Sequence, residues 1–88
     1  MVAAYRVEFS PEALSDLEKL DRVITQRILR KIKWLSQNFD DLTPEALKGE
    51  LKSLFKLRIV DWQVIYSVNQ TERLITLHLI GHRKDIYK

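Results

Sequence analysis

Two cations and one amide fall on the same face of a predicted β-hairpin. Lys56 and Arg58 alternate with apolar residues, and a two-residue loop at Val60-Asp61 places Arg58 opposite Gln63. Cations on a sheet face that no helix covers bind anionic groups such as phosphate, and the same pattern also suits plain solvation of an exposed face. The hairpin therefore indicates a candidate anion site with no conventional acid–base set.

The two histidines do not form a metal site or a catalytic couple in this pattern. His78 and His82 lie four residues apart in a predicted strand, a span of roughly 13 Å, which is too long for two ligands of one ion. The chain has no cysteine, and no carboxylate is spaced to pair with either histidine as an acid–base couple or triad. The sequence predicts no metal and no cofactor.

The elements that must position these residues follow from periodicity and caps. Residues 5–9 alternate as a half-buried strand. Ser10-Pro11 begins a short helix, and Asp21 caps a longer one whose apolar residues recur every three or four positions. The two helices read as a hairpin. Thr43-Pro44 predicts one further helical turn over residues 45–48.

The second half of the chain changes to a period of two. Strands are predicted over residues 55–59, 62–68 and 74–80. In the last strand, the core face is expected to hold Ile75, Leu77 and Leu79, and the opposite face Thr76, His78 and Ile80. The order is β-α-α-β-β-β, which predicts an α+β fold with a helical hairpin packed on one face of a mainly antiparallel four-stranded sheet.

Size and charge set the wider frame. A chain of 88 residues fits a single domain over residues 1–88. Its 15 Lys+Arg against 12 Asp+Glu give +3, and the basic residues gather on residues 22–33 and 48–58. This segregation points to an anionic partner, with nucleic acid the first candidate. The absence of a signal-peptide pattern and of a long apolar run predicts a cytoplasmic protein with no membrane contact.

Several segments together are more specific than composition. The segments are Leu47–Gly49, Leu54–Arg58, Asp61–Tyr66 and Gly81–Tyr87, and residues 5–13 precede them. In this order they resemble the RelE/ParE superfamily of bacterial and archaeal toxins from toxin–antitoxin pairs. The resemblance covers nearly the whole chain and implies the element order derived above.

The resemblance implies two activities. RelE-like members cut mRNA in the ribosomal A site, without metal, by attack of a 2′-hydroxyl on the adjacent phosphate. ParE-like members poison DNA gyrase and are not nucleases. Both are neutralised by a cognate antitoxin, and the toxin–antitoxin hetero-oligomer binds operator DNA through the antitoxin. A third reading is a non-catalytic homologue that only binds its antitoxin. The helical hairpin and sheet edge are the expected antitoxin surface, and the basic second helix suits an acidic antitoxin segment or ribosomal RNA.

The resemblance also assigns site residues. The catalytic set that it implies consists of Lys56, Arg58, Arg83 and Tyr87, and the RNA-binding set of Lys48, Lys52, Gln63, His78 and His82. Lys56 would serve as a phosphate-binding cation, or as a base if neighbouring cations lowered its pKa. His82 is a candidate proton donor. Two positions depart from the family pattern, because Gln63 replaces a usual arginine and Leu54 a usual lysine, and both departures weaken the nuclease reading.

Overall fold

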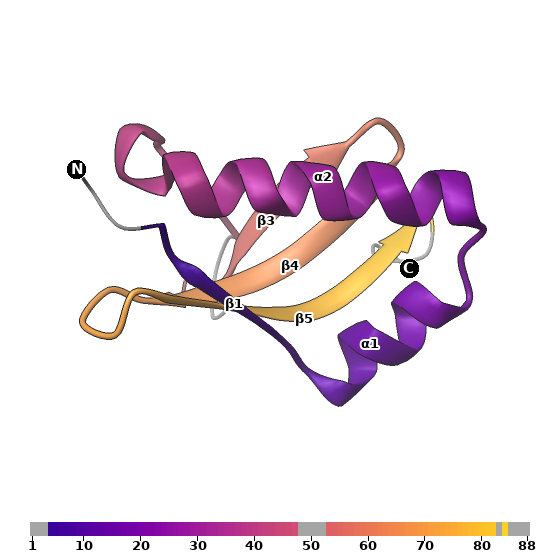
Figure 1. Cartoon of the computed structure of the whole chain (residues 1–88), viewed down its shortest axis with the longest axis horizontal. Helices are drawn as coiled ribbons and strands as arrows, with labels where there is room; N and C mark the ends of the chain where they lie inside the picture. The colour runs from indigo at the N-terminus through magenta and orange to yellow at the C-terminus, as the bar shows by residue number, and fades with distance from the viewer. Residues whose placement is uncertain (1–3, 48–52, 83, 85–88) are drawn as a thin grey trace.

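The computed structural model describes residues 4–47 and 53–82, together with residue 84. The elements in chain order are β1 (Arg6–Phe9), α1 (Pro11–Glu18), α2 (Arg22–Asn38), the 3-10 helix η1 (Phe39–Asp41), β2 (Glu45–Ala46), β3 (Phe55–Ile59), β4 (Trp62–Asn69) and β5 (Leu74–His82). They form one sheet in the order β1-β5-β4-β3-β2. β1 pairs with β5 in parallel and the other pairs are antiparallel. The predicted α+β fold is confirmed, with two helices against one sheet (Figure 1).

Both helices begin at the predicted caps. The Ser10 side chain accepts a hydrogen bond from the Ala13 N–H, with Pro11 in the first turn, and Asp21 accepts one from the Ile24 N–H. These caps satisfy N–H groups that have no partner within the helix. Figure 1 shows the long α2 running across the sheet, with the short α1 beside β5.

The core lies between α2 and the sheet. From α2, the side chains of Ile28, Ile32 and Leu35 are buried against Val64 and Tyr66 of β4. The rest of the buried cluster consists of Tyr5, Ala13, Phe39, Ile75, Leu77 and Ile80. Alternate residues of β3 and β4 therefore face the helices, and the residues between them face away.

The β3–β4 hairpin has the predicted register. Arg58 pairs with Gln63, and Lys56 pairs with Ile65, on the face away from the core. The turn is Val60-Asp61, and Val60 adopts a left-handed φ of 56°. Such a φ is unfavourable for a β-branched residue.

The last strand differs from its predicted alternation. Tyr66 pairs with Leu77 whereas Ile65 pairs with Leu79, so the intervening His78 forms a bulge. An extra residue reverses the faces of every residue after it. Ile80 is therefore buried in the core at 3% exposure while Leu79 is 45% exposed, and the predicted faces of these two residues are wrong.

Side chains at and near helix α1 bond to the backbone of β5 at the edge where the bulge lies. β1 ends at Phe9, opposite Leu77. Beyond that point the Ser10 hydroxyl donates to the His78 carbonyl at 3.0 Å, and Asp16 Oδ2 accepts from the Ile80 N–H at 3.0 Å. Side chains of the α1 segment thus replace the hydrogen bonds that a longer β1 would make.

The predicted helical turn over residues 45–48 is wrong where the structure describes it. Glu45 and Ala46 form strand β2, in which Glu45 pairs with Lys56 and Ala46 with Phe55, and the Leu47 N–H donates to the Leu54 carbonyl at 2.9 Å. Pairing with β3 outweighs the helical preference of these residues, because local propensity is worth only tenths of a kcal/mol per residue. This short edge strand makes the sheet five-stranded instead of four-stranded.

No helix in the described part of the chain is long and apolar enough to cross a membrane.

Candidate functional site

Strand β3 presents the two predicted cations on the face away from the core. Lys56 and Arg58 are two residues apart, a separation of roughly 7 Å along a strand. The Lys56 side chain is 19% exposed, and its Nζ lies 3.2 Å from Oε1 of Glu45, which is 66% exposed. Arg58 is exposed at the next position of this face. We call this surface, defined by Glu45, Lys56, Arg58 and Gln63, the β3 face.

The Glu45 carboxylate changes the chemistry expected of Lys56. A carboxylate at 3.2 Å stabilises the charged ammonium. Lys56 could act as a base only if neighbouring cations favoured its neutral amine, whereas Glu45 is an anion and favours the charged ammonium. Sequence reasoning missed Glu45 because this residue was assigned to a helix. The pairing of β2 with β3 places Glu45 directly opposite Lys56. Because β2 is only two residues long, its sequence shows no alternation from which a strand could be predicted.

Gln63 lies at the centre of the β3 face but is shielded from solvent. It pairs with Arg58 on one side and with Gly81, which has no side chain, on the other. Its side chain is 1% exposed, and neither Nε2 nor Oε1 has a hydrogen-bond partner among the described residues. The neighbouring Ile65 is 3% exposed. The expectation of an open face is therefore wrong over β4, and a buried unpaired amide costs about 1–3 kcal/mol per polar group.

The two histidines lie in different surroundings. His78 Nε2 is 2.8 Å from the Ser67 hydroxyl, on the same side of the sheet as the β3 face. The His82 ring meets Trp62 edge-on, with centroids 5.4 Å apart, and its Nδ1 accepts from the Lys84 N–H. Trp62 packs on the core side, so His82 lies on the opposite side of the sheet from Lys56. The structure does not bring the candidate proton donor to the β3 face.

Four predicted site residues lie outside the described residues. They are Lys48, Lys52, Arg83 and Tyr87. The roles that the resemblance implies for them stay predictions.

A cavity of about 260 Å³ connects the β3 face with α2. Its walls include Glu45, Lys56 and Arg58 from the sheet and Lys31 and Trp34 from the helix. Lys31 Nζ lies 3.9 Å from the centroid of the Trp34 ring, a cation–π contact. Three cations, Lys31, Lys56 and Arg58, thus line this cavity. The sequence signal for them was the clustering of basic residues on residues 22–33 and 48–58.

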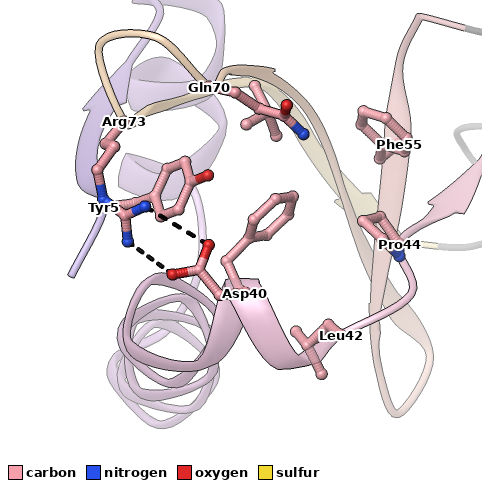
Figure 2. A pocket seen from close by; sticks show the side chains of 9 residues that line it. Tyr5, Asp40, Leu42, Pro44, Phe55, Gln70 and Arg73 are labelled. Atoms are coloured by element: carbon pink, nitrogen blue, oxygen red, sulfur yellow. Dashed lines mark hydrogen bonds and ion pairs between the residues drawn. The ribbon is translucent and has the colours of Figure 1, made fainter. Parts of the chain in front are cut away.

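A second cavity, of about 570 Å³, adjoins the first at Leu42 and Pro44, which line both cavities (Figure 2). Arg73 crosses its wall and pairs with Asp40 at 2.9 Å, while the guanidinium carbon lies 4.2 Å from the centre of the Tyr5 ring. The hydrogen bond with Asp40 raises the pKa of Arg73 above its ordinary value. Arg73 joins the β4–β5 turn to η1, so this cluster has the character of a structural clamp.

Burial in the core changes the ionisation of the Tyr66 phenol. Its side chain is 1% exposed beneath α2, and burial raises its pKa to about 12. The phenol therefore stays neutral near pH 7 and offers no charge to the site.

Comparison with known proteins agrees with this architecture. Residues 7–87 match the family model described as the ParE toxin of type II toxin–antitoxin system, parDE. A curated RelE-like toxin protein of Escherichia coli is 30% identical over 87 residues, which covers 94% of this chain and 90% of that protein. The fold is shared with the Mycobacterium tuberculosis RelBE2 toxin–antitoxin complex, with a TM-score of 0.83, 23% identity, and coverage of 94% and 95% of the two chains. The RelE–RelB complex of Pyrococcus horikoshii OT3 is similar at a TM-score of 0.72, 26% identity, and coverage of 92% and 97%.

The helix-covered sheet of this chain is thus a fold that it shares with known toxins of toxin–antitoxin complexes. The chain belongs to the ParE toxin family of type II toxin–antitoxin systems, within the RelE/ParE superfamily.

Proposed function

We propose that this chain inhibits translation by ribosome-dependent, metal-independent cleavage of mRNA and that a cognate antitoxin neutralises it. The observation that carries the proposal is the placement of Lys56 and Arg58 side by side on the outward face of β3. The similarity to the RelE-like protein of Escherichia coli supports the nuclease branch.

The β3 face supplies electrostatics to this reaction. The 2′-hydroxyl oxygen attacks the adjacent phosphorus and gives up its proton, the bond from phosphorus to the 5′-oxygen breaks, and the leaving 5′-oxygen takes a proton. Negative charge builds on the non-bridging oxygens, where guanidinium and ammonium groups stabilise it. Arg58 and the protonated Lys56 fill this role. Glu45 holds Lys56 in the charged form, so we assign Lys56 to phosphate binding and not to proton abstraction.

The C-terminal residues complete the proposal by resemblance. Arg83 is proposed as a second guanidinium for the phosphate, and Tyr87 as the residue that stacks on or orients a nucleotide. The ribosome then positions the mRNA, which a chain with few site groups needs for in-line attack. Gln63 offers hydrogen bonds without charge, so the positive charge of the site rests on β3 and on Arg83.

Inducible expression tests the nuclease. Primer extension on total mRNA is expected to show cuts within codons at the A site, and Lys56→Ala and Arg83→Ala are expected to relieve the growth arrest. Lys33→Ala removes an exposed cation from α2, away from the β3 face, and is expected to leave toxicity unchanged. Intact mRNA in arrested cells would refute the cleavage, and full toxicity of Arg83→Ala would refute its role.

The alternative activity within the superfamily is that of a DNA gyrase poison, which the similarity to RelE-like proteins does not favour. That activity would produce DNA breaks and a DNA-damage response while mRNA stays intact. A chain that only binds its antitoxin would cause no growth defect on expression. The same induction experiment, with DNA breaks scored beside the primer extension, separates the three activities.

The proposed partner is a protein. The similar chains of Mycobacterium tuberculosis and Pyrococcus horikoshii are described in complexes with antitoxins. We propose an antitoxin as the partner of this chain also, with operator DNA contacted through the antitoxin. A small acidic protein encoded beside this chain, and its co-purification with the chain, would support this assignment, and failure of the two proteins to associate would contradict it.

A further inference from the structure

The bulge in β5 turns two neighbouring side chains to the same side of the sheet. Leu77 and Ile80 are buried in the core, at 0% and 3% exposure, and His78 and Leu79 lie between them. A regular strand would have one residue or three between two residues of the same face. Both intervening side chains therefore lie on the side that carries the β3 face.

Two side chains outside the strand hold the backbone of this bulge. The Ser10 hydroxyl donates to the His78 carbonyl at 3.0 Å, and Asp16 Oδ2 accepts from the Ile80 N–H at 3.0 Å. Bulges are over-represented beside functional sites, where they redirect a side chain. Because hydrogen bonds fix the backbone on both sides of Leu79, the direction of the His78 side chain is set before a ligand arrives.

The imidazole ring of His78 is also held. Its Nε2 lies 2.8 Å from the Ser67 hydroxyl oxygen, a hydrogen bond between β5 and β4. Ser67 pairs with Thr76, so a second hydroxyl group lies on the same side of the sheet. Leu79, next to the histidine, is 45% exposed. We call His78, Ser67, Thr76 and Leu79 the His78 patch, which combines an aromatic ring with two hydroxyls and an apolar side chain.

The His78 patch differs in charge from the β3 face. It has no lysine, arginine or carboxylate among its four members. On the far side of Thr76, β1 places Glu8 opposite it, and a carboxylate there repels phosphate. Phosphate is therefore expected on the cations of β3, and an uncharged part of a ligand on the His78 patch.

The two parts of this side of the sheet lie within reach of one RNA strand. Ile65 of β4 pairs with Lys56 on one side and with Leu79 on the other. Neighbouring strands lie about 4.8 Å apart, so the His78 patch begins roughly 10 Å from Lys56 across the sheet. A strand of RNA bound by its phosphate at Lys56 therefore brings a base to the position of the patch.

We propose that the His78 patch binds a nucleobase of the RNA, with the base stacked on the imidazole ring. Histidine is one of the side chains on which unpaired RNA bases stack. Leu79 extends the apolar surface under the base, and the hydroxyls of Ser67 and Thr76 offer hydrogen bonds to its edge. The assignment rests on the proposed function, because it takes RNA as the ligand. It gives His78 a contact with a base, whereas Lys56 and Arg58 contact phosphate.

Fluorescence anisotropy with two labelled RNA strands on the full chain tests the proposal. Both short strands carry 2′-methoxy groups, which cannot attack the phosphate, and one of the strands lacks its bases. Comparison of the two affinities separates contact with bases from contact with phosphate. The strand with bases is expected to bind about tenfold or more tightly, a typical effect of stacking one base on an aromatic ring.

Four single variants assign the contacts. His78→Ala is expected to weaken binding of the strand with bases about tenfold and that of the base-free strand less than about twofold. His78→Phe keeps a ring for stacking and is expected to bind within about threefold of the wild type. Lys56→Ala is expected to weaken both strands equally, because both contain phosphate. His82→Ala removes the same ring from the other side of the sheet and is expected to leave the difference between the strands unchanged.

Several outcomes would overturn the proposal. Equal loss for both strands in His78→Ala would show a phosphate contact or a purely structural role, and circular dichroism identifies a variant that fails to fold. Binding by His78→Phe as weak as by His78→Ala would exclude stacking. Equal affinity of the wild type for the two strands, or binding of neither, would exclude a base site. Intact mRNA in arrested cells would refute the proposed cleavage and leave the His78 patch standing, because the strands used here cannot be cleaved.

Discussion

The strain at Val60 yields a quantitative prediction. A left-handed backbone costs a residue with a Cβ roughly 1–2 kcal/mol, and asparagine is one of the few side chains that visits this region readily. Val60 is 68% exposed, so its replacement sacrifices only about a third of the burial energy of a valine, or roughly 0.5 kcal/mol. Val60→Asn is therefore expected to raise the free energy of unfolding by about 1 kcal/mol. For a domain of this size that gain shifts Tm upward by about 4–8 °C.

Thermal and urea unfolding measure this shift, and Val23→Asn is the matched control. Val23 is also an exposed valine, at 64%, but it lies in the first turn of α2 with a helical backbone. Valine and asparagine have similar helix propensities, so the control is expected to change Tm little. A Tm equal to or below that of Val23→Asn would refute the strain argument.

Three further predictions concern single groups. Tyr66 has a folded pKa of about 12 against 10 in the unfolded chain, so the unfolded state loses its proton first and stability should fall by roughly 2–3 kcal/mol in total as the pH rises through these two values; urea melts at pH 9 and pH 11 should show about half of this loss, and Tyr66→Phe should reduce it. Glu45→Gln removes the ion pair with Lys56, and because the Glu45 side chain is 66% exposed the free energy of unfolding in urea melts should fall by no more than about 1 kcal/mol; a larger loss would contradict this view of the pair. Asp40→Asn weakens the clamp with Arg73, and because the pair is partly exposed the decrease in the free energy of unfolding in urea melts should be small.

The parts of the fold that local chemistry decides were predictable. Ser10 and Asp21 cap their helices as expected, because a side-chain oxygen satisfies N–H groups only a few residues away. The hairpin register followed from a two-residue turn and an apolar face, since one choice of turn fixes every pair. The amphipathic stripe of α2 likewise placed Ile28 and Ile32 in the core.

The parts that distant contacts decide were not predictable. The bulge at His78 depends on hydrogen bonds from Ser10 and on the end of β1, about seventy residues away in the chain, and no local pattern announces it. β2 exists through its pairing with β3, so Glu45 could not be placed beside Lys56 from its neighbours in sequence. The missed bulge put Leu79 and Ile80 on the wrong faces of the sheet, and the missed strand β2 left Glu45 away from Lys56.

The burial of Gln63 explains why this chain can lack the usual arginine at that position of the β3 face. At 1% exposure this position could hold an arginine only with an anionic partner beside it, because an unpaired buried charge costs several kcal/mol. Described neighbours of Gln63 in the sheet are the cation Arg58 and the side-chain-free Gly81, and neither would compensate a buried guanidinium. The amide of Gln63 avoids the burial of a charge, so the phosphate binding proposed above draws its positive charge from β3 and from Arg83. Under the proposed function, Arg58 is exposed and is the guanidinium of the described β3 face that a phosphate can reach while β4 stays in place. We therefore expect Arg58 to matter more in this chain than in relatives that carry an arginine at the position of Gln63.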